Sequence, residues 1–321
     1  MKNLIFFVLV VSFCSCSKDS ADPSPAKTDN TSKVLFSALL SSNPQKSQLF
    51  TMNSDGSSET QLTNFVTTGS LFTGFGSWSP DGTQIVFVTS KDGNSGGEIY
   101  SMKSDGTAAK RLTNNLRSEE YPTYSKDGSK ILYSVMVSTS PEKSQLFTMN
   151  SDGSGETQLT NFSTTTSLFT GYASWSPDGT QIVFVTNKDG NNNGGEIYSM
   201  KADGTNLKRL TNNQRSESSP TYSKDGGKIL YSAMVSTSPE KSQLFTMNSD
   251  GTNESQLTNF STTTSLFTGF ASWSPDGSQI IFVTNKDGNS NGGEIYTMKA
   301  DGTNLKRLTN NQRVEEHPKW K

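Results

Sequence analysis

One motif recurs six times along the chain and constrains its architecture more than any other feature. Trp78, Trp175 and Trp273 lie 97 and 98 residues apart in nearly identical surroundings. Tyrosine or tryptophan takes the same place half a period later, which gives six aromatic markers spaced 46 to 51 residues apart: Trp78, Tyr124, Trp175, Tyr222, Trp273 and Trp320. A period of 40 to 50 residues is typical of propeller blades, which bury their faces against neighbouring blades.

Each unit is predicted to hold four short strands. In the unit near Gly171 these are the run into Trp175, then Gln181–Thr186, Glu196–Lys201 and 208–211. Ser-Pro-Asp-Gly and Ala-Asp-Gly-Thr form tight turns after the first and third strands. The second strand is apolar on both faces, which favours a sheet packed between two others. The sequence therefore predicts an all-β, six-bladed propeller of four-stranded blades.

The two ends of the chain are predicted to share one blade. Residues 317–321 resemble a first strand with no second strand after it, and residues 33–36 align with the second strand at 130–133. Pairing of these two segments would complete the sixth blade and remove two exposed sheet edges. We therefore expect a closed propeller over residues 33–321.

Composition excludes several other classes of protein. Only 31% of the 321 residues are hydrophobic, and the abundance of Ser, Thr, Asn and Gly argues against a helical bundle. A net charge of −2 provides no basic surface for nucleic acid. His317 is the one histidine in the sequence, which removes most His-based acid–base and metal chemistry.

The N-terminus is predicted to be a secretion signal. A basic start and a short apolar run occupy residues 1–15, and this run is too short to span a membrane as a mature helix. This end resembles a lipoprotein signal of the Bacteroidetes, which implies lipid on Cys16 and anchoring to the outer membrane, on its periplasmic or its outer side. Polar residues 16–32 then form a flexible tether that starts at the lipidated Cys16.

The repeated motifs carry a family resemblance. Trp-Ser-Pro-Asp-Gly before an apolar strand, followed by Glu-Ile-Tyr-x-Met and Arg-Leu-Thr, resembles the TolB-type repeat, also described as a WD40-like PD-type repeat. The resemblance covers residues 33–321 and implies a six-bladed propeller. Proteins of the TolB type carry an additional N-terminal α/β domain, where this sequence has only the tether. The resemblance therefore does not extend to their transport role.

Candidate binding residues lie in the longer connections, which the strand order places on one face. Loops on a rigid scaffold are the usual place for binding. Phe72, Phe169 and Phe267 form either an exposed patch for a protein or sugar, or a local core folded back over the blade. A second set precedes the first strands and forms either a charged ring at the channel mouth or mutual salt bridges: Arg117, Glu119, Arg215, Glu217, Arg313 and Glu315.

Two loops have the alternating oxygen ligands of a calcium loop. They are formed by Asp189, Asn191 and Asn193, and by Asp287, Asn289 and Asn291. The acidic residue expected at the twelfth position is missing, so a hairpin loop of turn residues is the alternative, and any calcium binding would be weak. No other cofactor is expected.

These observations favour a non-enzymatic, lipid-anchored propeller of the cell envelope. We expect it to bind an envelope protein or a polysaccharide, to contact the membrane only through the lipid, and to bind no nucleic acid. The alternatives are a propeller enzyme acting on carbohydrate or peptide, and a calcium-dependent adhesive module. The near-identity of the three double units argues against an asymmetric catalytic pocket. Two matches to Gly-x-Ser-x-Gly lie in glycine-rich loops and not at a strand-to-helix turn.

Overall fold

The computed structural model describes residues 32–93, 96–190, 194–213, 215–288, 292–311 and 313–321. The expected signal, Cys16 and most of the tether lie outside the described residues, as do Asn191, Asn193, Asn289 and Asn291. Among the residues described, no helix is long and apolar enough to cross a membrane.

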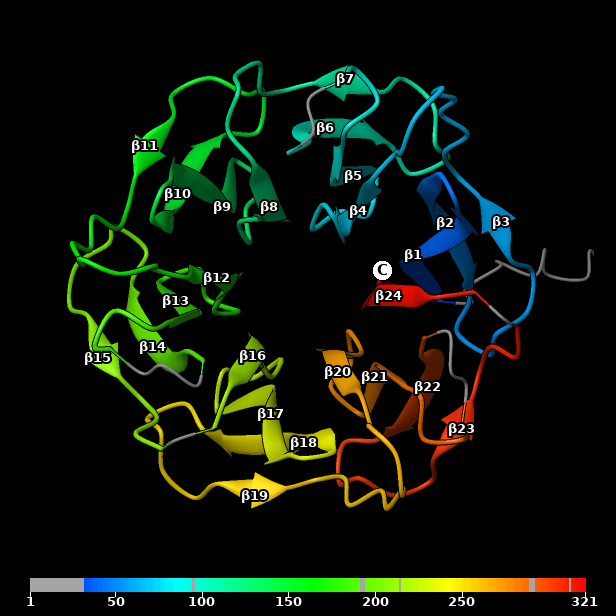
Figure 1. The fold of residues 1–321 in the computed structure, drawn as a ribbon, viewed down its shortest axis with the longest axis vertical. Coiled ribbons are helices and arrows are strands. Elements are labelled where there is room, and N and C mark those ends of the chain that lie inside the picture. Colours follow the sequence, from blue (N-terminus) through cyan, green and yellow to red (C-terminus); the bar gives the residue numbers. More distant parts are fainter. Residues whose placement is uncertain (1–31, 94–95, 191–193, 214, 289–291, 312) are drawn as a thin grey trace, which may run out of the picture. The chain divides into compact units, whose positions relative to one another are not determined.

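In the described part of the chain, twenty-four strands form six four-stranded sheets arranged as the blades of a ring (Figure 1). The first strand of each blade lies innermost. The blades are β4 (Thr73–Trp78), β5 (Gln84–Thr89), β6 (Glu98–Lys103) and β7 (Lys110–Arg111); β8 (Glu119–Tyr124), β9 (Lys130–Thr139), β10 (Glu142–Asn150) and β11 (Thr157–Gln158); β12 (Thr170–Trp175), β13 (Gln181–Thr186), β14 (Glu196–Lys201) and β15 (Lys208–Arg209); β16 (Glu217–Tyr222), β17 (Lys228–Thr237), β18 (Glu240–Asn248) and β19 (Ser255–Gln256); β20 (Thr268–Trp273), β21 (Gln279–Thr284), β22 (Glu294–Lys299) and β23 (Lys306–Arg307); and β24 (Glu315–Trp320), β1 (Lys33–Ser42), β2 (Gln45–Asn53) and β3 (Thr60–Gln61).

The sixth blade joins the two ends of the described chain, as the sequence predicts. Strand β24 pairs antiparallel with β1, with Val34 opposite Trp320 and Ala38 opposite Glu315. The Lys321 amide also donates to the Lys33 carbonyl at 2.8 Å. The prediction of a six-bladed propeller closed by strands from both termini is therefore confirmed.

The core lies between neighbouring blades. The second and third strands are buried on both faces because each sheet packs between two others. Val86 and Val88 of one blade pack with Ile131 and Tyr133 of the next. Six such clusters surround the ring. Each blade is therefore stabilised by its neighbours on both sides.

Two kinds of blade alternate, a feature that the sequence analysis did not anticipate. In three blades the second and third strands are ten and nine residues long and form a long hairpin, as in β9 and β10. In the other three these strands are six residues long and are joined by a glycine-rich loop. We call these the hairpin blades and the loop blades.

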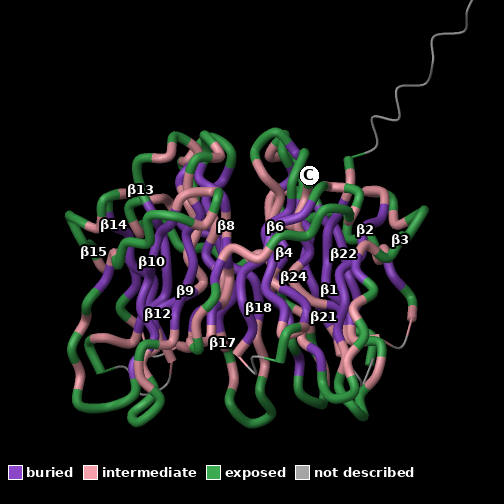
Figure 2. Tube along the Cα trace, turned by 90° about the horizontal axis from the view of Figure 1, so that it is seen from above, coloured by how far each residue is buried: buried purple, intermediate pink, exposed green. Residues whose placement is uncertain are grey.

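The two ends of the ring differ in their connections. Buried segments run along the middle of the strands, and exposed connections lie at both ends (Figure 2). One end carries only the Ser-Pro-Asp-Gly and Asp-Gly-Thr type turns, and we call it the short-turn face. The other carries the hairpins, the glycine-rich loops and the segments before the first strands, and we call it the long-loop face. Strand β1 begins on the short-turn face.

Deletion of residues 315–321 is expected to open the ring. It would expose the edge of β1 and part of the face of the β20–β23 sheet, and remove Trp320 from the cluster around Phe36 and Ile281. We expect a loss of several kcal/mol, on the scale of about 3–5 kcal/mol for deleting a large buried aromatic side chain. Thermal unfolding followed by circular dichroism measures this, with Lys321→Ala as the control. An unchanged melting temperature in the truncated chain would contradict the closure.

Candidate functional site

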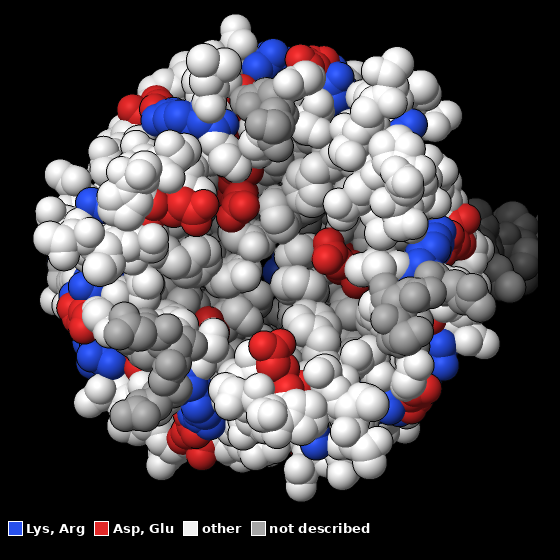
Figure 3. All heavy atoms as spheres, in the orientation of Figure 1, with Lys and Arg blue, Asp and Glu red and all other residues white. Residues whose placement is uncertain are grey.

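The six first strands surround a central channel with a cavity of about 220 Å³. Figure 3 shows this hollow from the long-loop face, with acidic side chains at its rim. The third residue of each first strand has a positive φ of 51° to 54°, and the pairing register with the second strand shifts there. Such a bulge turns an additional side chain away from the ladder, here into the channel. The six residues are Phe75, Tyr121, Tyr172, Ser219, Phe270 and His317.

These residues form an aromatic collar that is interrupted at one place. Ring centroids lie 4.3 Å apart between Phe75 and Tyr121 and 4.4 Å apart between Tyr121 and Tyr172. On the other side, His317 lies 4.8 Å from Phe75 and 3.9 Å from Phe270. Ser219 occupies the remaining position, so the collar has a gap between Tyr172 and Phe270.

A layer of hydroxyl groups with one cation lies below the collar, toward the short-turn face. Five blades contribute Ser77, Thr123, Ser174, Thr221 and Ser272, and the sixth contributes Lys319. Burial lowers the pKa of Lys319 to about 8, and no acidic neighbour among the described residues offsets this effect. A buried cation surrounded by neutral donors and acceptors is suited to bind an anion.

The rim of the channel on the long-loop face is acidic. Glu120 and Glu316 lie one residue before the collar in their strands, and burial raises the pKa of both carboxyls. Burial also raises the pKa of Tyr121. The neighbouring Tyr172, Glu120 and Glu316 raise this pKa further. Both carboxylates therefore act on the same tyrosine from different blades. Charge along the channel changes from negative at the rim to positive at Lys319.

His317 belongs to the wall of the channel. Burial lowers its pKa to about 3, and Lys319 adds to this effect, so the imidazole is neutral at physiological pH. Among the residues described, neither ring nitrogen has a hydrogen-bond partner. Its ring packs on Phe270 and Phe75. His317 therefore acts as an aromatic ring of the collar and is poorly placed to be a general base.

Phe72, Phe169 and Phe267 lie directly above the collar at the mouth. Their ring centroids are 4.9 to 5.2 Å from those of Phe75, Tyr172 and Phe270. Phe267 is exposed, whereas the other two are partly buried. The rings thus pack on the collar with one face and leave part of their surface to solvent.

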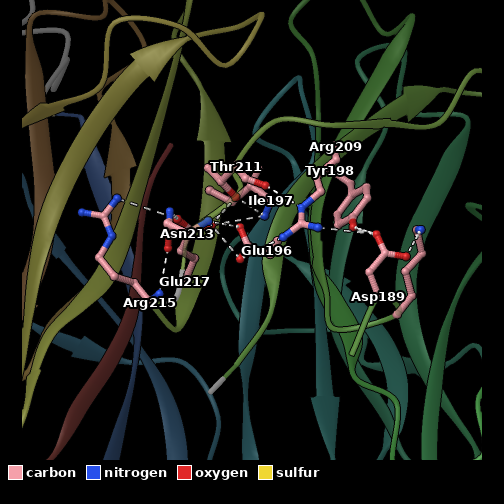
Figure 4. Close-up of polar contacts among 10 residues, drawn as sticks. Asp189, Glu196, Ile197, Tyr198, Arg209, Thr211, Asn213, Arg215 and Glu217 are labelled. Carbon is pink, nitrogen blue, oxygen red and sulfur yellow. Dashed lines mark hydrogen bonds and ion pairs between the residues drawn. The ribbon is translucent and has the colours of Figure 1, made fainter. Parts of the chain in front are cut away.

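The predicted arginine and glutamate set is divided between two places. Figure 4 shows Glu217 facing Thr211, Asn213 and the Ile197 amide, and Arg215 beside it. Burial raises the pKa of Glu217 to about 7. Glu119 and Glu315 occupy the same buried positions in their own blades. These carboxylates fix the loops around them and are not exposed for binding.

The arginines point along the blades and not into the channel. Arg117 pairs with Glu156 at 2.5 Å and Arg313 pairs with Glu59 at 2.7 Å. Arg215 pairs with Glu254 in the same way, and its guanidinium lies over Phe245. Each pair joins the start of the innermost strand to the outermost strand of one blade. Arg215 and Arg313 also approach Glu217 and Glu315, at 4.0 and 3.3 Å.

The two aspartates of the candidate calcium loops are bound by cationic and phenolic side chains. Asp189 accepts from Lys188 Nζ at 2.6 Å and from the Tyr198 hydroxyl, and Arg209 lies 3.8 Å away (Figure 4). Asp287 has the same three kinds of partner. No group of three or more His, Cys, Asp or Glu side chains suited to a metal occurs among the described residues. A cation would have to displace these partners.

The channel residues were missed in the sequence analysis, although a signal for them exists. They lie four, three and one residues before each aromatic marker, and the hairpin blades differ from one another at all three positions. Regular alternation places only every second residue on one face, so the bulge obscures which residues face the channel.

The TolB beta propeller domain model matches residues 65–168 and 163–268, which is more than half of the chain. The chain belongs to the TolB beta propeller domain family, as its repeats suggested. Dipeptidyl-peptidase 5 of Porphyromonas endodontalis is 31% identical over 113 residues, which cover 34% of this chain and 15% of the peptidase.

Two solved structures show the same fold. TolB from Acinetobacter baumannii has a TM-score of 0.71 and 20% identity over 90% of this chain and 66% of that chain. A chain of a nidogen/laminin complex has a TM-score of 0.64 and 10% identity over 90% of this chain and 98% of that chain. At these identities the likeness concerns the fold alone.

Lys319→Thr is expected to stabilise the fold at neutral pH. Thr123 and Thr221 occupy the same position in two other hairpin blades, so the replacement fits. The depressed pKa means that charged Lys319 opposes folding below pH 8, by at most about 3 kcal/mol and less where channel water screens the charge. The folded state loses this penalty as the pH rises from about 8 toward the unfolded pKa near 10.5.

Melting temperatures between pH 6 and 10.5 measure the effect. We expect the variant to melt several degrees above the wild type at pH 7 and the difference to shrink above pH 8. Lys126→Thr, at an exposed lysine on the short-turn face, is the control. A constant difference across this range would contradict a buried, charged Lys319.

Proposed function

We propose that this protein is a non-enzymatic binding module of the cell envelope, anchored by lipid on Cys16, that recognises a protein or glycan partner through its long-loop face. One observation carries the proposal: Phe72, Phe169 and Phe267 surround the mouth of a channel whose wall is an aromatic collar. Aromatic side chains on a rigid support dominate the energy of many interfaces.

The two faces of the ring support this choice of side. The short-turn face repeats nearly the same turns in every blade, so it offers little by which a partner could be distinguished. The long-loop face differs more from blade to blade and therefore offers the surface by which a partner can be distinguished.

The chemistry of the channel favours binding over catalysis. Its one imidazole is neutral, buried and without a hydrogen-bonded carboxylate to orient it. Nucleophilic and general-base catalysis need a base within hydrogen-bond reach of the group that it activates. The nidogen/laminin complex gives a precedent for this fold in a complex of two proteins.

Site-specific photo-crosslinking in native envelopes tests the choice of face. A photoreactive amino acid replacing Phe267 should form defined adducts, whereas one replacing Lys126 on the short-turn face should form few. Binding of the partner so identified should weaken at least tenfold, about 1.4 kcal/mol, in the triple variant Phe72→Ser, Phe169→Ser and Phe267→Ser.

Because these rings also pack on the collar, the single variant Phe267→Ser accompanies the triple variant, and circular dichroism confirms that each is folded. Lys126→Ser with Lys224→Ser is the matched control. Adducts confined to the position of Lys126 would show binding on the short-turn face and contradict the proposal.

Lipid on Cys16 has its own test. Mass spectrometry of protein extracted from membranes should show an acylated N-terminal peptide that begins at Cys16. The variant Cys16→Ala should fractionate with soluble proteins, because more than one acyl chain is needed for stable anchoring and the variant would carry none. Undiminished membrane association of Cys16→Ala would contradict the anchor.

A further inference from the structure

Two of the three hairpin blades are nearly identical along their second and third strands, whereas β1 differs from β9 at six of ten positions. Strands β9 and β17 differ at one of ten positions, and β10 and β18 have the same sequence. Their first strands read EEYPTY, ESSPTY and EEHPKW in β8, β16 and β24. Three of the four positions that vary belong to the rim, the collar and the hydroxyl layer. The first strands of the hairpin blades therefore make the channel asymmetric.

We propose that this channel binds a short free peptide, with its C-terminal carboxylate at Lys319, a side chain in the collar gap at Ser219 and its ammonium group at Glu120 and Glu316. The inference rests on the proposed binding function and names the ligand that the channel itself takes.

The inner end is suited to a carboxylate. Lys319 is the only Lys or Arg among the residues that line the cavity, and Ser and Thr hydroxyl groups from five blades surround it. A carboxylate accepts charge-assisted hydrogen bonds from an ammonium group and further bonds from hydroxyl groups. Binding would pair a buried charge that has no acidic partner among the described residues.

The middle of the channel is suited to one apolar or aromatic side chain. Five rings line the wall, and the sixth position holds the small Ser219. The gap between Tyr172 and Phe270 therefore opens to one side of the collar. A cavity of about 220 Å³ is smaller than the roughly 300–1,000 Å³ of pockets for drug-sized ligands, which limits the ligand to a small molecule.

The rim is suited to a cation. Glu120 and Glu316 come from different blades, and both act on Tyr121. They precede the hydroxyl layer by three residues, which corresponds to about 10 Å along a strand. An extended peptide of two to three residues spans a similar length. An acidic sugar chain would carry repeated negative charges past these carboxylates and is therefore disfavoured.

Calorimetry with the full-length chain and the tripeptide Ala-Phe-Ala tests the proposal. The comparison ligands are its C-terminal amide, its N-acetyl form and digalacturonate. Each variant introduces the residue that another hairpin blade has at the same position: Lys319→Thr as in Thr221, Ser219→Tyr as in Tyr121, and Glu316→Ser as in Ser218. Lys126→Thr is the control, and melting temperatures confirm that every variant is folded.

We expect the wild type to bind the free tripeptide at least tenfold more tightly than its amide, and Lys319→Thr to bind both equally weakly. Ser219→Tyr should reduce binding at least tenfold by filling the gap. Glu316→Ser and N-acetylation of the peptide should each weaken binding several-fold. Because both remove the same contact, the two changes together should weaken binding no more than either one alone.

Equal affinity of the wild type for acid and amide, or no heat at 10 mM tripeptide (about the weak end of useful binding), would overturn the proposal. Tighter binding of digalacturonate would overturn it in favour of an acidic sugar. If the peptide does not bind while crosslinks at the position of Phe267 still form, the peptide assignment fails and the proposed function stands. Loss of those crosslinks would instead remove the proposed function.

Discussion

The pairing of β24 with β1 is the contact on which the rest of the structure depends. Each blade buries both faces of its sheet against its neighbours, so an open ring would leave two sheets half covered. The same pairing brings His317 and Lys319 into the channel beside residues more than 240 positions earlier in the sequence. Closure therefore stabilises the fold and completes the site in one step.

The bulge in each first strand is the second requirement. A regular strand would present alternate residues to the channel, whereas the positive φ at the third residue turns that side chain inward as well. Bulky residues such as Tyr121 and Phe270 rarely adopt this conformation. Its repetition in all six blades shows that the scaffold imposes it, and the collar is the consequence.

The sequence was sufficient to predict the blades, their strands and the closure, because turn residues and aromatic markers recur at a fixed spacing. It was insufficient for the site. Arg117 pairs with Glu156, 39 residues away, a contact that the local Arg-x-Glu motif does not indicate. The collar depends on a backbone irregularity that no periodic pattern reports. Only the bulge and the curvature of the ring bring Tyr121, Tyr172 and His317 into one wall.

The alternation of blades explains why asymmetry arises where it does. In the loop blades the rim position is Gly74, Gly171 or Gly269, and a Cβ atom there would lie 2.9 Å from the ring of Phe72, Phe169 or Phe267. A larger residue at these three rim positions would require the phenylalanine ring to move. In the hairpin blades, β8, β16 and β24 carry Glu120, Ser218 and Glu316 at this position. The rim position is constant in the loop blades and varies in the hairpin blades, which gives a repeated fold an asymmetric channel.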